Sequence, residues 1–223
     1  MTPPIHECSE PLVDIRNGTQ LLYGPPPECP ETEPHYRLMR VGVYQRLLRA
    51  QSRLPMGYRL RLYEGLRSLN VQEQLFAQES ARVLVREPHL TPQRVHQRAT
   101  LLVSPLTHWD GSRNTPPHST GGAVDVEIVD ATGSVIDFGM EIRDWVGVEP
   151  SWCAPQHPGL GGVAHQNRDL LAQVMGNEGF ARFDSEWWHF SYGDQYWARK
   201  QGHPAAIYGS CSPELIFNAL ALP

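Results

Sequence analysis

The sequence lacks the features of a membrane protein or a nucleic-acid-binding protein. No stretch of the 223 residues is long and apolar enough for a transmembrane helix. The formal net charge of −5 gives no electrostatic reason to expect binding to nucleic acid or to an anionic membrane. The first residues have neither a basic start nor an apolar run, so we expect no secretory signal and a cytoplasmic protein.

The sequence also has few cysteines. Cys8, Cys29, Cys153 and Cys211 are scattered without a C-x-x-C pair, which argues against a zinc ribbon or a thioredoxin-like motif. Because no secretory signal is expected, a disulfide framework is not expected either, and the four are interpreted as free thiols. There is no Gly-x-Ser-x-Gly elbow, so nothing indicates a covalent acyl-enzyme.

The composition is that of an ordinary globular protein. With 40% hydrophobic and 19% charged residues, the chain is long enough to bury a core and too short to require a second one. We therefore expect a single domain over residues 1–223. The oligomeric state does not follow from the sequence.

Two distant stretches carry residue types that bind metal ions. His118 and Asp125 flank a Gly-Gly bend, and His189 lies near the end of the chain. Imidazole nitrogens and carboxylate oxygens are good zinc ligands, and a catalytic zinc typically takes three of them and leaves one position for water. Glu186, three residues before His189, is a candidate general base for that water. Together these residues predict a hydrolytic site with one Zn²⁺ per chain.

Each of these residues is also compatible with an ordinary structural role. His118 lies in a segment rich in proline and glycine, where a solvated histidine is common. The alternation in residues 123–129 predicts a strand with Asp125 and Glu127 on one face. If that face is covered, Asp125 needs a partner; if it is open, Asp125 is an ordinary polar strand residue. A protein without a metal therefore remains an alternative.

The combination of motifs resembles a known family. The pattern His-x-x-Gly-x-Ala-x-Asp occurs at residues 118–125, Glu-x-Trp-His follows at 186–189, and Arg67 comes just after a strand in the first third of the chain. In this order they resemble the zinc D-alanyl-D-alanine dipeptidases and their carboxypeptidase relatives, which cut peptidoglycan-type peptides ending in D-alanine. The resemblance covers nearly the whole chain, from about residue 12 to residue 194, and implies a small peptide substrate with D-amino acids.

The expected mechanism uses Glu186 and Arg67. A zinc ion lowers the pKa of its bound water, Glu186 takes the proton, and the resulting hydroxide attacks the peptide carbonyl. Arg67 is expected at a strand-to-helix corner, because Gly65 ends the strand before it, and there its guanidinium can stabilise the oxyanion. Glu186 then protonates the leaving amine.

The sequence departs from the family at positions that bear on the substrate. The dipeptidases carry serine two positions before the first histidine, where this chain has Pro116, which has no hydroxyl. For the substrate's amino group, Glu141 or Asp144 is a candidate, and Tyr23 and Ser119 are further candidates for substrate binding. A dipeptide other than D-Ala-D-Ala, or a longer peptide cut by carboxypeptidase action, therefore stays open.

The hydrophobic spacing predicts helices and strands without regular β-α-β alternation. This is typical of an α+β domain, an antiparallel sheet with helices packed on it, with the metal in a cleft walled by loops. A non-hydrolytic zinc-binding protein of the same fold is the alternative function. In the first half of the chain the expected elements are a helix over 36–54 with its arginines on the solvated face, a strand over 58–63, a helix to Arg86 capped by Asn70 with Glu73, and a helix from Thr91-Pro92. In the second half they are a strand over 123–129 joined by a hairpin to 134–137, a helix ending near Gly176 or Gly179, a strand near Phe190, and a short helix capped by Ser212. Residues three apart on a regular strand face opposite ways, so Glu186 is expected either before the strand near Phe190 or at a bend.

Overall fold

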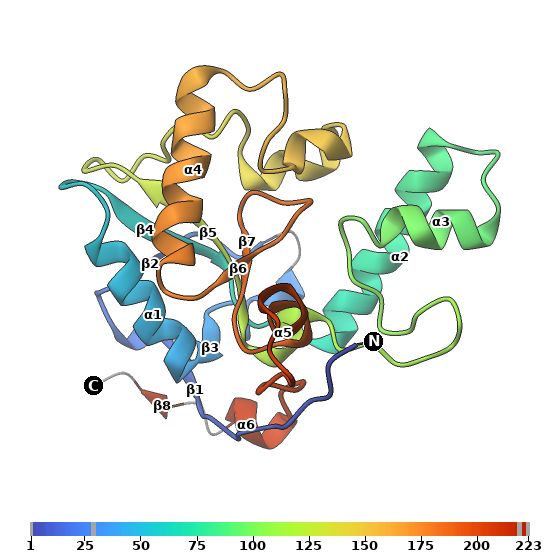
Figure 1. The fold of residues 1–223 in the computed structure, drawn as a ribbon, viewed down its shortest axis with the longest axis horizontal. Coiled ribbons are helices and arrows are strands. Elements are labelled where there is room, and N and C mark those ends of the chain that lie inside the picture. The colour runs from blue at the N-terminus through green and yellow to red at the C-terminus, as the bar shows by residue number, and fades with distance from the viewer. Residues whose placement is uncertain (1, 28–29, 218–219, 222–223) are drawn as a thin grey trace.

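The chain has an α+β fold built on two sheets (Figure 1). The computed structural model describes residues 2–27, 30–217 and 220–221. The larger sheet has the strand order β2-β4-β5-β7-β6, and its pairs are antiparallel except for the parallel β2–β4 pair. The smaller sheet has the order β3-β1-β8. The predicted fold class is confirmed.

The strands are mostly short. They are β1 Leu12–Asp14, β2 Leu22–Tyr23, β3 Leu38–Arg40, β4 Arg59–Glu64, β5 Ala123–Val129, β6 Ala181–Arg182, β7 His189–Ser191 and β8 Leu220–Ala221. The α-helices are α1 Val41–Ser52, α2 Leu69–Arg86, α3 Pro92–Ala99, α4 Gly162–Gly176, α5 Gln195–Gln201 and α6 Pro213–Phe217. Short 3₁₀ helices are η1 Ile15–Asn17, η2 Pro30–Thr32, η3 Pro117–Thr120, η4 Ile142–Gly147 and η5 Pro150–Cys153.

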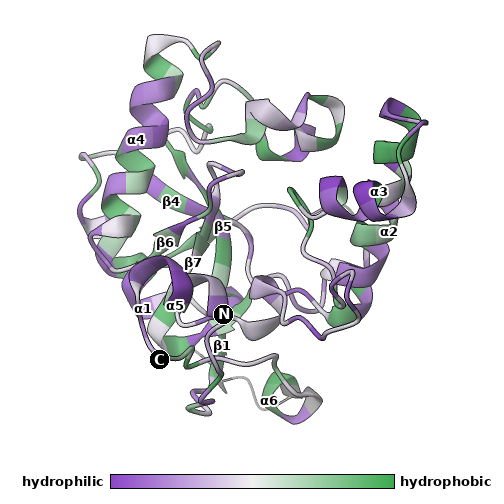
Figure 2. Cartoon of the chain, turned by 45° about the vertical axis from the view of Figure 1, so that its right-hand side comes forward, coloured by the Kyte–Doolittle hydropathy of each residue, from purple (hydrophilic) through white to green (hydrophobic). Residues whose placement is uncertain are grey.

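Strand β5 is the centre of the larger sheet, and all its residues are buried. Its Val124, Val126 and Ile128 belong to the main hydrophobic cluster, together with Leu60 and Leu62 of β4. Figure 2 shows helix α5 largely in the hydrophilic colour. Helices α1 and α4 pack on each other beside the sheet, while α2 and α3 form a pair at the other end of the molecule (Figure 1). No helix in the described part is both long and apolar enough to cross a membrane.

The helix predicted over 36–54 begins later than expected. Residues 38–40 pair with β1 as strand β3, and the helix runs only over Val41–Ser52. The prediction that its arginines are solvated is wrong for Arg40, which is fully buried. Spacing alone did not reveal this, because the apolar positions of a short strand continue into the helix without a break.

The predicted boundaries of the other helices mostly agree with the structure. Helix α2 ends at Arg86 as expected, but its N-cap is Ser68, whose hydroxyl accepts a hydrogen bond from the Val71 amide, and the predicted cap by Asn70 with Glu73 is wrong. Thr91 caps α3 as predicted. Helix α4 ends at Gly176. Ser212 accepts from the Leu215 amide at the start of α6.

The hairpin after β5 is only partly formed. The chain turns at Gly133, whose φ of +83° is readily adopted by glycine, and comes back toward β5. The return consists of a bridge between Val129 and Val135 and of two backbone hydrogen bonds, from the Ile136 amide to the Ile128 carbonyl and from the Asp130 amide to the Ser134 carbonyl. Cys8, Cys153 and Cys211 are free as predicted, and Cys29 lies outside the described residues.

Candidate metal centre

The three predicted ligands come together on one face of the larger sheet. Asp125 of β5 is the direct cross-strand partner of His189 of β7. Side chains of such a pair share a face and lie close together. His118 comes from η3, the turn that leads into β5, and all three side chains are buried. The ligand atoms lie within 4.8 Å of one another.

The spacing of these atoms fits a zinc ion. His118 Nε2 is 3.0 Å from His189 Nδ1 and 3.4 Å from an Asp125 oxygen, and His189 Nδ1 is 3.0 Å from the other Asp125 oxygen. Atoms bound to one ion in tetrahedral geometry at zinc–ligand distances lie about 3.3–3.5 Å apart. The residues present, two imidazoles and one carboxylate, also form a donor set that zinc prefers.

The site favours the protonation state that a metal needs at Asp125 and at His189. The Nδ1–H of His118 donates to the Gly65 carbonyl at 2.7 Å, which leaves Nε2 as the nitrogen with a free lone pair. Burial would raise the pKa of Asp125, but His118 and His189 outweigh it and hold the pKa well below its usual range. Burial lowers the pKa of His189. Burial would lower the pKa of His118 as well, but the Asp125 carboxylate outweighs it and raises that pKa. A charged carboxylate and neutral imidazoles are the forms that bind zinc.

The Gly-Gly bend after His118 requires both glycines. Gly121 has a φ of +68°, and a side chain there would meet the Leu12 methyl at 2.8 Å. A Cβ at Gly122 would lie 2.3 Å from the Tyr192 carbonyl oxygen, too close for any real contact. The bend therefore brings the His118 turn and β5 closer to their neighbours than other residues allow.

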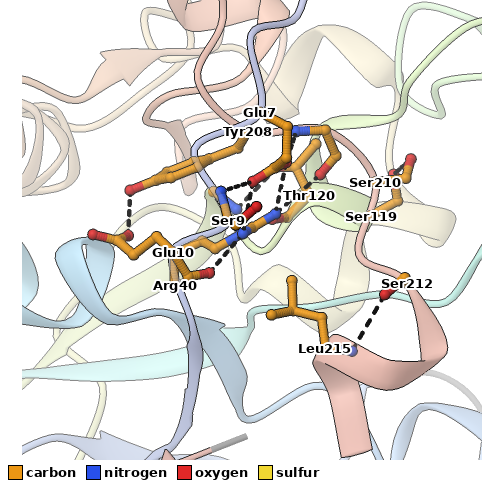
Figure 3. Close-up of polar contacts among 12 residues, drawn as sticks. Glu7, Ser9, Glu10, Arg40, Ser119, Thr120, Tyr208, Ser210, Ser212 and Leu215 are labelled. Carbon is orange, nitrogen blue, oxygen red and sulfur yellow. Dashed lines mark hydrogen bonds and ion pairs between the residues drawn. The ribbon is translucent and has the colours of Figure 1, made fainter. Parts of the chain in front are cut away.

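The buried Arg40 ties the His118 turn to both ends of the chain (Figure 3). Its Nε donates to the Thr120 carbonyl at 2.8 Å, and its two terminal nitrogens each donate to a carboxylate oxygen of Glu7 at 3.1 Å. One of these nitrogens also donates to the Gly209 carbonyl at 3.3 Å. Because Thr120 is two residues from His118, this network fixes the turn that carries the ligand.

Arg67 is held at the edge of the same face by residues that the sequence analysis did not identify. Its Nε donates to Glu64 at 2.9 Å, its Nη2 makes an ion pair with the other Glu64 oxygen, and its Nη1 donates to Gln72 at 3.1 Å. A bulge in β4 between Leu62 and Glu64 places Glu64 opposite Asp125, so Glu64 shares the Asp125 face. The available signal was an acid three residues before the arginine.

Glu186 lies where a general base for the site is expected. It precedes β7, which is one of the two predicted arrangements, and its carboxylate is 3.9 Å from His189 Nδ1. The residue is 8% exposed. Because Glu186 lies outside the strand, its side chain and that of His189 can both reach the metal position. Two residues three apart on a regular strand would point to opposite faces.

These residues open into a cavity of about 310 Å³ between the sheet and helix α2. Its wall includes Arg67, His118, Asp125, Glu186 and His189. Most of the remaining wall comes from α2, the segment from residue 100 to 117, the 142–145 turn and α5. The volume suits a small molecule with several polar groups around it.

The four further candidates for substrate binding lie elsewhere. None of Tyr23, Ser119, Glu141 and Asp144 is among the described residues that line the cavity. Ser119 is buried and its hydroxyl donates to the Pro116 carbonyl at 2.7 Å, while Glu141 forms an exposed ion pair with Arg143. A role for these four in substrate binding stays a prediction.

The chain is similar to proteins that are already known. A family model described as D-ala-D-ala dipeptidase matches residues 37–206. A D-alanyl-D-alanine dipeptidase of Synechocystis sp. is 30% identical over 236 aligned residues, which cover 92% of this chain and 94% of that protein. One of Enterococcus faecalis is 26% identical over 63% of this chain and 65% of that protein. The solved structure of VanYB in complex with D-Alanine-D-Alanine is 15% identical over 74% of this chain and 77% of that chain, with a TM-score of 0.44.

Proposed function

The chain belongs to the D-Ala-D-Ala dipeptidase family of zinc metallopeptidases, and we propose that it hydrolyses D-alanyl-D-alanine or a closely similar dipeptide. The observation that carries this proposal is the meeting of His118, Asp125 and His189 in one cavity, with Glu186 beside them. Residues from distant parts of the chain meet there with the donor types of a catalytic zinc site.

In this proposal each residue has a separate task. His118, Asp125 and His189 hold the zinc ion. When bound, zinc lowers the pKa of water and polarises a carbonyl group. Glu186 accepts a proton from the attacking water and later gives it to the leaving amine, which its position beside His189 allows.

Arg67 stabilises the negative charge that develops on the scissile carbonyl oxygen. Its guanidinium is fixed by Glu64 and Gln72, so little reorganisation is needed when that charge appears. Arg67 lies at a strand-to-helix corner. Its backbone amide donates a hydrogen bond to the His118 carbonyl at 3.2 Å, so this corner is held against the His118 turn. Because water is the attacking group in this proposal, no covalent intermediate between enzyme and substrate is needed.

The test is the Glu186→Ala variant. We expect it to bind one zinc ion per chain and to lose hydrolysis of D-Ala-D-Ala by several orders of magnitude, because ligands remain while the base is removed. Zinc is measured by emission spectroscopy and released D-alanine by a coupled assay, with L-Ala-L-Ala as the control substrate. Full activity of this variant would contradict the role of Glu186, and an inactive wild type that binds zinc would contradict the substrate.

One observation supports a second candidate, carboxypeptidase action on longer peptides. The carboxylates that line the cavity in the described residues are those of Asp125 and Glu186, and both already have a task. The described part of the chain places no further acid in the cavity wall to pair with the free amino group of a dipeptide, whereas Arg67 and Arg199 supply positive charge. A peptide whose amino group is acylated does not need such an acid.

The two candidates differ in the substrate they prefer. Comparison of kcat/KM for D-Ala-D-Ala, its N-acetyl derivative and a pentapeptide ending in D-Ala-D-Ala distinguishes them. A dipeptidase loses activity on acylation, while a carboxypeptidase keeps or gains it. The expectation that residues 1–223 act as one zinc peptidase domain, and the expected cytoplasmic location, stay predictions.

A further inference from the structure

His189 has a second ring nitrogen whose surroundings are buried. Its Nδ1 faces Asp125, and its Nε2 lies 3.4 Å from the hydroxyl oxygen of Ser191, which has no exposed surface. Ser191 is two residues further along β7, so the two side chains share a face of the strand. A histidine that binds a metal through one nitrogen usually donates from the other, and this fixes its tautomer.

Beyond Ser191 lies a carboxylate with an unsatisfied oxygen. Asp194 is 1% exposed, and its Oδ1 accepts a hydrogen bond from the Trp197 amide at the start of α5. Its Oδ2 is buried and has no hydrogen-bond partner within the described ranges. Burial raises the pKa of Asp194, and the Trp197 amide and the nearby Ser191 hydroxyl oppose this rise. A buried acceptor without a hydrogen bond destabilises the folded protein, so its presence here calls for an explanation.

We propose that Ser191 and Asp194 are positioning residues for His189. In this arrangement the Nε2–H of His189 donates to Ser191 Oγ, and the Ser191 hydroxyl donates to the Asp194 carboxylate. The hydrogen on Nε2 leaves Nδ1 with a lone pair directed at the metal position, beside Asp125. The opposite tautomer would place a hydrogen there and compete with the ion. This inference rests on the proposed zinc function of His189.

The two residues act through His189 and do not touch the substrate. Neither Ser191 nor Asp194 is among the described residues that line the cavity. Their effect is therefore on ligand orientation, and partners of this kind typically change metal affinity about 10- to 100-fold. By contrast, a purely structural role of Asp194 as the cap of α5 would change stability alone.

The test compares Ser191→Ala with Asp194→Asn. Asparagine caps a helix as well as aspartate, so Asp194→Asn preserves α5, while Ser191→Ala removes the hydroxyl without touching the cap. We expect both variants to bind zinc about 10- to 100-fold more weakly than the wild type in competition with a chromophoric chelator. Glu178→Gln, remote from the site, is the control for loss of stability alone and is expected to keep the affinity.

A second measurement does not depend on activity. In the zinc-loaded protein labelled with ¹⁵N-histidine, nuclear magnetic resonance reports how fast the hydrogen on His189 Nε2 exchanges with water. We expect slow exchange in the wild type, because a buried hydroxyl holds that hydrogen, and faster exchange in Ser191→Ala. Unchanged exchange together with unchanged zinc affinity in Ser191→Ala would overturn the proposal. A wild type that binds no zinc would instead contradict the proposed function.

Discussion

At the scale of single residues, the position of Arg67 depends on a carboxylate outside the family motif. Glu64 binds Arg67 through two nitrogens and is 2% exposed, so the guanidinium is fixed by a buried partner. A bidentate pair of an arginine and a carboxylate fixes the orientation of the guanidinium and also stabilises it. The sequence motif identified Arg67 but not Glu64, which fixes its orientation. Glu64 reaches this face only because of the bulge in β4, and the local sequence does not indicate that bulge.

We therefore expect Glu64→Gln to lower kcat by about 10- to 100-fold while zinc content stays at one per chain, because a misplaced Arg67 no longer meets the carbonyl oxygen. Steady-state kinetics and emission spectroscopy measure the two quantities. Glu127→Gln is the matched control. Like Glu64, Glu127 is a buried glutamate of the larger sheet that forms an ion pair with an arginine, here Arg61 of β4. Equal losses in the two variants would mean that Glu64 matters only for stability.

The residue scale is also where the sequence was most informative. Residue type and spacing indicated His118, Asp125 and His189 as ligands, and required Glu186 to lie before its strand or at a bend. The structure brings the four residues together. Substrate contacts were less predictable. Tyr23, Glu141 and Asp144 were chosen by likeness of sequence position, and which loop residues reach a cavity depends on tertiary packing.

At the scale of elements, the Gly-Gly bend joins the His118 turn to β5. We expect Gly122→Ala to destabilise the protein by about 2–4 kcal/mol, because its Cβ would overlap the Tyr192 carbonyl. Zinc affinity should fall as well, since the turn and the strand would move apart. Chemical denaturation and chelator competition measure the two effects. Gly147→Ala, with open space around it, is the control, and a Gly122→Ala protein with wild-type affinity would count against the bend as a positioning element.

Helix α1 is fastened to the end of helix α4 by a cluster of charges. Arg49 and Arg53 both donate to the Glu178 carboxylate, at 2.7 and 2.9 Å. Burial would raise the pKa of Glu178, but the two arginines outweigh it and lower the pKa. The folded protein therefore holds this carboxylate ionised more strongly than the unfolded chain does.

The sign of the resulting pH dependence follows from the lowered pKa. The stabilisation is present above the ordinary glutamate pKa and is lost as the pH falls through the folded value. Glu178→Gln should cost about 1 kcal/mol at pH 7, because both arginines are half-exposed and screened, and its difference from the wild type should shrink below about pH 4. Urea unfolding at several pH values measures this. A difference that grows on acidification would contradict the assignment.

The elements themselves show where sequence reasoning works and where it fails. Strand β5 and helices α2, α3 and α4 were predicted because each has a long periodic pattern or a clear end signal. Strand β3 was missed because its three residues form a strand only by pairing with β1, and because α1 follows them without a break. Pairing over long sequence distance leaves little local signal, and the same holds for β8 beside β1.

At the scale of the whole molecule, zinc binding should be linked to folding. The ligands come from η3, β5 and β7, so a bound ion joins segments that are separate in the unfolded chain. At free zinc about 1,000-fold above Kd the folded state gains about 4 kcal/mol. For a protein of this size that corresponds to an increase in Tm of about 10 °C over the metal-free protein. Calorimetry with and without chelator measures the change, and His189→Ala should show none of it.

The central claim is that His118, Asp125 and His189 hold one zinc ion. Anomalous X-ray diffraction at the zinc absorption edge, from crystals of the zinc-loaded protein, tests it most directly. The account predicts one strong peak per chain at about 2.0–2.2 Å from His118 Nε2, an Asp125 oxygen and His189 Nδ1. A peak bound to other residues, or none in a protein that hydrolyses its substrate, would contradict it.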